Sequence, residues 1–273
     1  YRLPPRRERI EFPDNMIFGV VPSLQDDIDT FFSGWRERGL RHFFLRPNYL
    51  GYAAVFPRGY ERTIYEVFQK ARAIGLMGVD FDGGCAERRQ RDLEEYVVAR
   101  MITHPDLPFE AICDEFYAQF GAAAEDVRRV RERIRARGER SLVRDIQGDA
   151  KRRILDDSLL GRFAVLAHDE ASLAEDLRIL REAREKRASA LTDDQRRRLD
   201  GEIVRAEHSL VTYRFYAAGS GDAPDLEKLK AAEAELLAFR LAHKAAIGHA
   251  FEGFYDRTSG EDRIREKLGV KRD

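Results

Sequence analysis

The sequence predicts an α/β domain with a small parallel sheet, followed by an all-α domain. Two observations predict this class. The first 84 residues alternate short apolar runs with segments whose apolar residues recur at helical spacing, which is typical of consecutive βαβ units. After Gly84 the strand pattern ends, and the remaining chain shows amphipathic helical patterns joined by short loops. We therefore expect residues 1–87 to carry three parallel strands and residues 88–273 to form a helical bundle.

The predicted strands are continuous apolar runs, which are typical of parallel strands covered on both faces. An extended lead-in, rich in proline, precedes the first of them. Ser23 is the expected N-cap of the first helix, and Gly39 and Gly75 are expected to end the two helices. This order gives a right-handed parallel series, which forms either a small open sheet or part of a barrel. The strands are residues 16–21, 42–46 and 77–82, and the helices between them are residues 24–38 and 61–74.

The second domain is predicted from its helical periodicity and its end signals. Thr192 and Gln195 have the spacing of a capping box, which opens a long helix. Glycine and proline residues separate the other segments, while residues 139–157 are polar and ambiguous. The predicted helices are residues 93–101, 109–120, 125–136, 159–166, 172–190, 193–217 and 225–245.

Composition excludes several classes of function. The chain has 48 basic and 49 acidic residues, so it lacks the basic excess of a nucleic-acid-binding protein. The arginine-rich residues 128–140 have acidic neighbours, and we interpret them as a solvated helix face. No apolar run is long enough to span a membrane. The two cysteines and six histidines show no metal-ligand spacing. We expect no cofactor and no metal, and the sequence leaves the oligomeric state open.

Two carboxylates at the end of the third strand are the leading candidate catalytic residues. Asp80 and Asp82 are two residues apart, so strand alternation places both on one face, with Cα atoms roughly 6.5–7 Å apart. Paired carboxylates at such distances perform glycoside hydrolysis, one as acid and the other as base or nucleophile. The alternative is that they cap the following helix or pair with a neighbouring arginine.

Polar and aromatic residues also follow the second strand. Arg46 and Asn48 share a face and are candidates to line the same pocket as the two acids, with Arg46 binding an anionic group or forming an internal bridge to an aspartate. Tyr49 ends this segment, and Tyr52 follows in the loop. These tyrosines either provide a stacking platform for a sugar ring or pack the loop onto the domain.

The motifs of residues 45–52 (LRPNYLGY), 56–59 (FPRG), 78–84 (GVDFDGG) and 92–129 have a specific order. Together they resemble the carboxyl-terminal portion of a bacterial domain-of-unknown-function family of glycoside-hydrolase-like (β/α)8-barrel proteins, related to α-glucuronidases and β-hexosaminidases. The residues that match best are Leu93, Tyr96, Val97, Ala99, Arg100, Pro105 and Asp106, then Asp114, Glu115, Phe116, Phe120, Gly121, Ala123 and Ala124.

This resemblance implies that the three strands are the last three of a TIM-type barrel, and that a helical domain follows the barrel. It implies a carbohydrate partner at the strand ends and a secreted or periplasmic protein. In related barrels the principal acid comes from an earlier strand, so the chain is expected to be a fragment that holds part of an active site. The competing hypothesis is a non-catalytic helical scaffold or interaction module with a degenerate barrel remnant.

Overall fold

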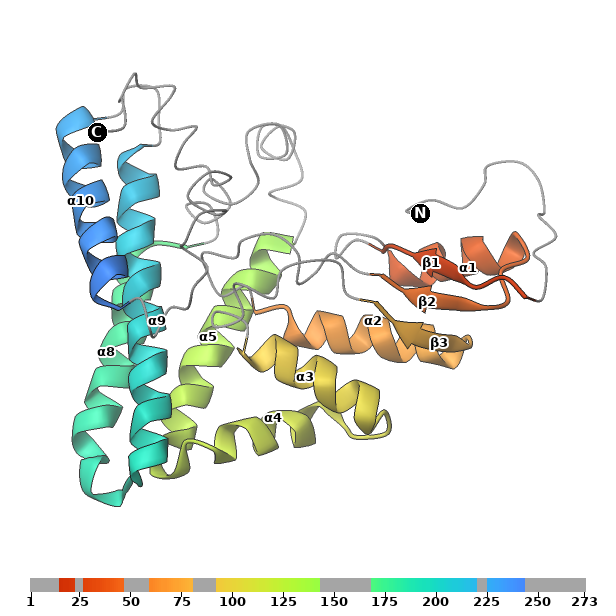
Figure 1. Ribbon diagram of the computed structural model, residues 1–273, viewed down its shortest axis with the longest axis horizontal. Helices are drawn as coiled ribbons and strands as arrows, with labels where there is room; N and C mark the ends of the chain where they lie inside the picture. Colours follow the sequence, from red (N-terminus) through yellow and green to blue (C-terminus); the bar gives the residue numbers. More distant parts are fainter. Residues whose placement is uncertain are drawn as a thin grey trace. The chain divides into compact units, whose positions relative to one another are not determined.

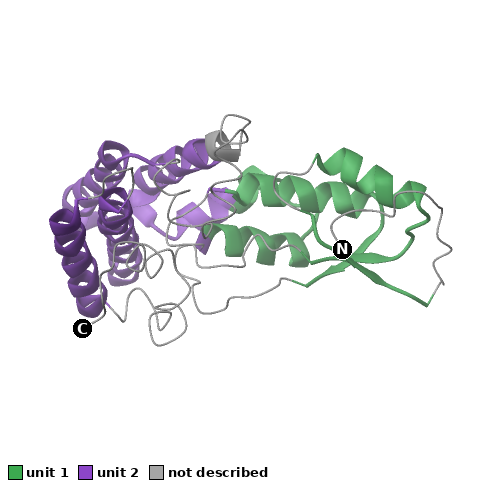
Figure 2. Cartoon of the chain, turned by 90° about the horizontal axis from the view of Figure 1, so that it is seen from above, with its two compact units in different colours: residues 1–52, 60–85, 93–112 green, residues 53–59, 86–92, 113–273 purple. Residues whose placement is uncertain are grey.

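The computed structural model describes residues 15–22, 27–46, 59–80, 92–142, 168–219 and 225–243. The chain divides into two compact units, which Figure 2 colours separately. Unit 1 comprises residues 1–52, 60–85 and 93–112, and unit 2 comprises residues 53–59, 86–92 and 113–273. Residues 93–112, which lie beyond the expected boundary at residue 87, thus group with the sheet.

Unit 1 contains the three parallel strands that the sequence predicts, in the order β1-β2-β3 (Figure 1). Each strand is shorter than its apolar run, because only three or four residues of each run join the hydrogen-bonded ladder. The strands are β1 (Phe18–Val20), β2 (Phe43–Leu45) and β3 (Leu76–Val79), and the helices between them are α1 (Ile28–Glu37) and α2 (Glu61–Ala73).

The helix ends follow local chemistry. The N-cap of α1 is Asp27, whose carboxylate accepts hydrogen bonds from the backbone N–H groups of Asp29 and Thr30. The helix therefore starts later than predicted, and Ser23 lies outside the described residues. Gly39 and Gly75 follow α1 and α2 with φ angles of 96° and 99°, which confirms their predicted role as helix stops.

One face of the sheet is packed against helices. Val20, Phe43 and Leu45 are 0–2% exposed, and the Phe43 ring lies 5.8 Å from that of Phe32 in α1. Figure 2 shows the helices of unit 1 together on one side of its strands. This is the arrangement that right-handed crossovers give when sequential strands are also neighbours in the sheet.

Helix α2 also fixes the turn between α3 (Asp92–Thr103) and α4 (Phe109–Ala118). The Tyr65 hydroxyl donates to the carbonyl of Leu107, and the Gln69 amide donates to that of Pro105, both at 3.0 Å. Arg72 donates to the Pro105 carbonyl as well, and binds Asp106. The proline-rich turn thus satisfies its backbone acceptors through one face of α2.

Unit 2 is helical, as the sequence predicts. Its core is an apolar cluster, formed by Leu173 and Leu177 of α8, Phe215 and Tyr216 of α9, and Leu229 of α10, among others. A short 3-10 turn at residues 188–190 replaces the end of the predicted helix 172–190, and another, at residues 121–123, lies between two predicted helices. The predicted helix 159–166 lies outside the described residues. The main helices are α5 (Ala124–Leu142), α8 (Glu170–Lys186), α9 (Asp193–Ala218) and α10 (Leu226–Ala242).

The predicted capping box at the start of α9 is confirmed, and it supports a stability prediction. The Thr192 hydroxyl accepts from the Gln195 N–H at 3.3 Å, while the Gln195 side chain accepts from the Thr192 N–H at 3.0 Å. We expect Thr192→Ala to lower the free energy of unfolding by about 1 kcal/mol, because the backbone N–H of Gln195 loses its hydroxyl acceptor. Urea denaturation measures this change. Ser189→Ala, which removes another exposed hydroxyl three residues earlier, should change it far less.

Candidate functional site

The carboxyl ends of β2 and β3 bring two predicted site residues together. The Asp80 N–H donates to the Leu45 carbonyl at 2.7 Å, and the Arg46 N–H donates to the Val20 carbonyl at 2.8 Å. These bonds extend the ladder by one residue past each strand. As a result, Arg46 Nε lies 3.2 Å from Asp80 Oδ2. The expected proximity of the arginine and the first aspartate is therefore observed.

This ion pair remains accessible to water. The side chains of Arg46 and Asp80 are 46% and 60% exposed. An exposed pair of this kind contributes little to stability. A carboxylate has about four lone-pair sites, so one contact leaves Asp80 able to accept hydrogen bonds from the hydroxyls of a ligand.

The other predicted site residues lie outside the described residues. These are Asp82, Asn48, Tyr49 and Tyr52. The paired-carboxylate arrangement of Asp80 with Asp82 therefore stays a prediction, as does the tyrosine platform.

The structure adds an aromatic residue that sequence reasoning did not assign to the site. In the sheet register, Phe44 lies between Gly19 of β1 and Gly78 of β3. A Cβ atom built on Gly19 would lie 2.8 Å from Cζ of Phe44, so the ring lies over that glycine. A Cβ atom on Gly78 would meet nothing within 4 Å. We call this row of residues 19, 44 and 78 the glycine–phenylalanine row.

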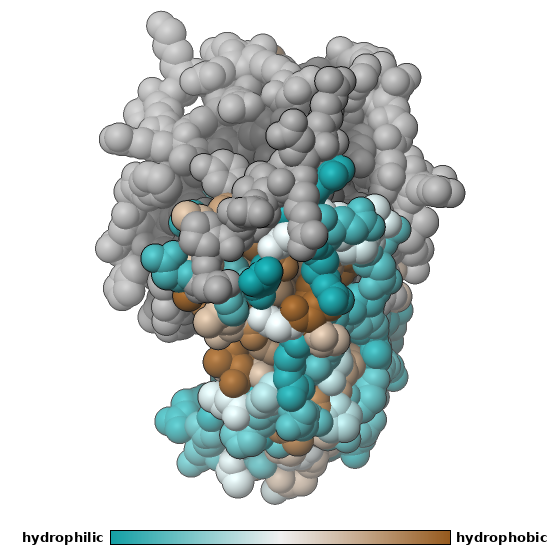
Figure 3. Space-filling model, turned by 90° about the vertical axis from the view of Figure 1, so that its right-hand side faces the viewer, coloured by the Kyte–Doolittle hydropathy of each residue, from teal (hydrophilic) through white to brown (hydrophobic). Residues whose placement is uncertain are grey.

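The row and the ion pair belong to the same face of the sheet. Phe44 precedes Arg46 by two residues, and Gly78 precedes Asp80 by two, so each pair shares a face. This face is opposite to the one that packs against helices. It also carries Ile17, which is 51% exposed. Figure 3, which views the right-hand side of Figure 1, shows hydrophobic patches among hydrophilic surface.

This face combines an aromatic ring with an exposed ion pair. An aromatic ring covers the apolar side of a ligand, and an exposed carboxylate with a guanidinium can bind its hydroxyl or anionic groups. The sequence contains the three residues of the glycine–phenylalanine row, but in three separate segments. Only the strand register shows that these residues are neighbours in the sheet.

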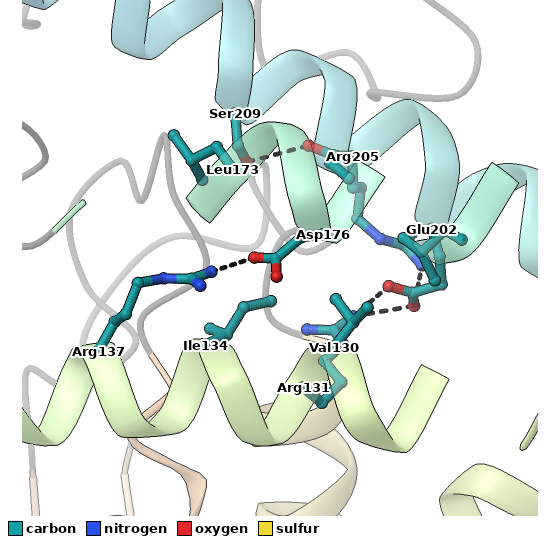
Figure 4. Close-up of a pocket in the computed structure, with 11 residues that line it drawn as sticks. Val130, Arg131, Ile134, Arg137, Leu173, Asp176, Glu202, Arg205 and Ser209 are labelled. Carbon is teal, nitrogen blue, oxygen red and sulfur yellow. Dashed lines mark hydrogen bonds and ion pairs between the residues drawn. The ribbon is translucent and has the colours of Figure 1, made fainter. Parts of the chain in front are cut away.

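Unit 2 holds a second concentration of ionisable residues, which we call the buried charge cluster. Its side chains come from three helices, α5, α8 and α9, and Figure 4 draws all of them except that of Arg133. Two acids in it each bind two arginines. The cluster consists of Arg131, Arg133, Arg137, Asp176, Glu202 and Arg205.

Glu202 lies at one end of the cluster. Nη2 of Arg131 is 2.8 Å from both of its carboxylate oxygens, and Nη2 of Arg205 is 2.5 Å from Oε1. Both side chains of the Arg131–Glu202 pair are 5% exposed. Although burial raises the pKa of Glu202, the charges and hydrogen bonds of the two arginines outweigh it and lower the pKa to about 2.

Asp176 joins α8 to α5 at the other end of the cluster. It accepts from Arg133 Nε at 2.6 Å and from Arg137 Nη2. Arg137 Nε also donates to Nδ1 of His168 at 3.2 Å, so this ring is neutral. Burial, reinforced by the charge of Arg137, lowers the pKa of His168 to about 4, although Asp169 opposes the shift.

The interpretation of residues 128–140 as a solvated helix face is therefore wrong for part of the segment. Arg131 and Arg137 are only 5% and 3% exposed. Each forms an ion pair with an acid of another helix, Glu202 and Asp176 respectively. The cluster surrounds a cavity of about 20 Å³, which has room for about one water molecule. The acids are bound by arginines, and the arrangement holds three helices together.

Within the described ranges, no group of three or more histidine, cysteine, aspartate or glutamate residues is placed to hold a metal ion. The same part of the chain contains no helix that is long and apolar enough to cross a membrane. Comparison with known proteins gives no match to a protein family, a curated protein or a solved structure.

The buried charge cluster predicts a large effect of one substitution. We expect Glu202→Gln to destabilise unit 2 by about 3–5 kcal/mol, because Arg131 and Arg205 lose a buried partner. Glu207→Gln is the matched control, because the Glu207–Arg181 pair is 31% and 52% exposed and should contribute less than about 1 kcal/mol. Urea denaturation at pH 7 measures both changes.

The same variant has a predicted pH dependence. The pKa of Glu202 is about 2 in the folded protein against an ordinary value of 4.5. Because the pKa is lower in the folded state, the ionised Glu202 carboxylate stabilises the fold above pH 4.5. This stabilisation is lost as the pH falls toward 2. The difference in unfolding free energy between the wild type and Glu202→Gln should therefore shrink across that range. A constant difference would contradict the assignment.

Proposed function

We propose that this chain is the C-terminal part of a carbohydrate-active, glycoside-hydrolase-like protein, and that it binds a saccharide at the carboxyl ends of β2 and β3. The observation that carries the proposal is the shared sheet face of the glycine–phenylalanine row and the Arg46–Asp80 pair. Ligand sites of parallel α/β folds lie at the carboxyl ends of the strands. The resemblance to glycoside-hydrolase-like barrels, which the motifs of residues 45–129 carry, agrees with this proposal.

The topology of unit 1 supports membership of a larger barrel. Its strands are parallel and neighbours in the sheet are consecutive in sequence. Consecutive βα units of a (β/α)8 barrel have this order, with helices outside and the opposite face of the sheet inside. In this proposal, the three strands are the last three of a TIM-type barrel, and the open face with Phe44 lines its interior.

The residues then have distinct roles. Phe44 stacks on the apolar side of a sugar ring. Asp80 and Asp82 act as the carboxylate pair at the reacting bond, or bind hydroxyl groups beside it. Arg46 orients the Asp80 carboxylate through their ion pair, in which Nε lies 3.2 Å from Oδ2. Asn48, Tyr49 and Tyr52 complete the sugar-facing edge.

A second candidate is a non-catalytic helical scaffold or interaction module. The structure of unit 2 favours it in one respect. Glu202 and Asp176 are used to join helices, as is Arg214, which bridges Glu170 of α8 and Glu235 of α10. A helical bundle whose charged side chains form ion pairs between its helices is suited to a structural role. The two candidates differ in whether unit 1 binds a sugar.

The discriminating experiment titrates the full chain with a panel of neutral oligosaccharides and uronic-acid glycosides. We expect binding that weakens about fivefold in Phe44→Ala, because loss of one stacking contact costs about 1 kcal/mol. Asp80→Asn and Asp82→Asn should also weaken it. Calorimetry measures the affinity, and circular dichroism establishes that each variant is folded.

Unit 1 offers a matched control for these variants. Asp106 is also an exposed acid paired with an arginine, at 2.7 Å from Arg72, but it lies in the α3–α4 turn and away from the strand ends. Asp106→Asn should leave sugar binding unchanged. Absence of binding by the wild type, or equal binding by the wild type, Asp80→Asn and Asp82→Asn, would favour the scaffold.

A further inference from the structure

The contact between α9 and α10 contains a buried histidine that faces an arginine. His208 of α9 is 1% exposed, and Arg240 of α10 is 7% exposed. Nε of Arg240 donates to Nε2 of His208 at 3.2 Å. The His208 ring also stacks with Phe239, at a centroid distance of 6.1 Å and an interplanar angle of 21°. Phe239 in turn lies 4.4 Å from the ring of His243.

This hydrogen bond requires a neutral histidine. A guanidinium can only donate, so Nε2 of His208 must carry a lone pair. Protonation of that nitrogen would remove the acceptor and place a second N–H and a second positive charge 3.2 Å from Arg240 Nε. Because both groups are buried, water cannot screen their repulsion well.

We propose that α10 is docked on α9 through an acid-labile contact, and that proton uptake by His208 on opening makes the release of α10 more favourable as the solution becomes mildly acidic. This inference goes beyond the proposed saccharide site, because it concerns a conformational change within unit 2. It depends on the Arg240–His208 geometry and not on the function of unit 1.

The ionisable groups described around this contact lie on α8, α9 and α10. On α10, Arg240 faces His208 directly and His243 lies beyond Phe239. On α9, Arg205 and Glu202 lie one and two turns before His208 and are bound to each other. Helix α8, which packs on α9, contributes Asp176, which is bound to arginines of α5. Among the described residues, the nearby acids thus already have arginine partners.

The electrostatic environment of His208 determines how docking of α10 depends on pH. Burial and then the charge of Arg240 lower the pKa of His208 well below its usual value of 6.5. In the released state the ring regains its ordinary pKa. The docked state is therefore at full stability above pH 6.5, and it loses stability as the pH falls below that value.

Release of α10 would separate it from the apolar cluster of unit 2. It is the last helix in the described part of the chain, and it packs on the apolar cluster through Leu229 and Leu236. Its other side already exposes Leu237 and Leu241, by 45% and 78%. An undocked α10 would therefore present leucines on both sides, which makes it suited to bind another apolar surface.

Amide hydrogen exchange of the full chain tests the proposal. After correction for the intrinsic pH dependence of exchange, the opening constant of α10 should rise about tenfold from pH 7.5 to pH 5.5, because opening takes up one proton. Amides of α3 serve as the internal reference. His208→Gln keeps an acceptor for Arg240 but cannot be protonated, so its α10 should show no such rise. His104→Gln, at the exposed end of α3, should behave as the wild type.

Two results would overturn the proposal: an unchanged opening constant in the wild type, or an equal rise in His208→Gln. Because His208→Gln can fail to fold, a second measurement uses the wild type alone. An NMR titration of the His208 ring should show it neutral at pH 5.5 while α10 is docked. A ring that titrates near pH 6.5 with α10 still docked would also overturn the proposal.

Discussion

The register of three short parallel strands is the constraint on which the candidate site depends. Hydrogen bonds pair Phe44 with Gly19 on one side and with Gly78 on the other, and they extend one residue further to align Arg46 with Asp80. Side chains alternate along a strand, so a shift of one residue in β2 would move Phe44 and Arg46 to the helix-covered face. Burial of Val20, Phe43 and Leu45 beneath the helices prevents that shift. The packing of the apolar face thus determines which groups the opposite face presents.

Unit 2 depends on a different constraint, which is that buried charges need partners. Arg131 and Arg137 are two helical turns apart on α5, and each meets an acid from another helix, Glu202 of α9 and Asp176 of α8 respectively. Such pairs add little net stability compared with apolar packing, but loss of one partner is costly. They favour one alignment of the three helices, since a displaced helix would leave a charge buried without its counterpart. The histidines that accept from Arg137 and Arg240 extend the same principle to neutral partners.

Local signals in the sequence predicted the elements well, and long-range contacts account for what they missed. Apolar runs and glycine stops located the three strands, and the capping box at Thr192 located the start of α9, because these signals depend on neighbours in sequence. The segment of residues 128–140 was misjudged because its periodicity cannot show that acids 39 and 71 residues further along lie opposite it. The proximity of Arg46 to Asp80 followed from strand alternation. Phe44 was missed because its role depends on glycines in both neighbouring strands, which only the register reveals.

The open face of the sheet connects these observations to function. Parallel sheets are normally covered on both faces, yet in unit 1 the described helices lie on one side and the other presents Ile17, Phe44 and Arg46. A solvent-exposed sheet face would carry polar residues in alternation with the buried ones. The apolar residues on this face therefore favour a ligand or another part of a protein packed against it. A barrel interior with a bound sugar meets this requirement, because an aromatic ring and an ion pair at the strand ends suit a ligand that is apolar on one side and polar at its edge. A scaffold would need a protein surface there, and the exposed ion pair at the strand ends would then lose water without a matching partner, at a cost in free energy. The composition of this face therefore supports the saccharide site that we propose.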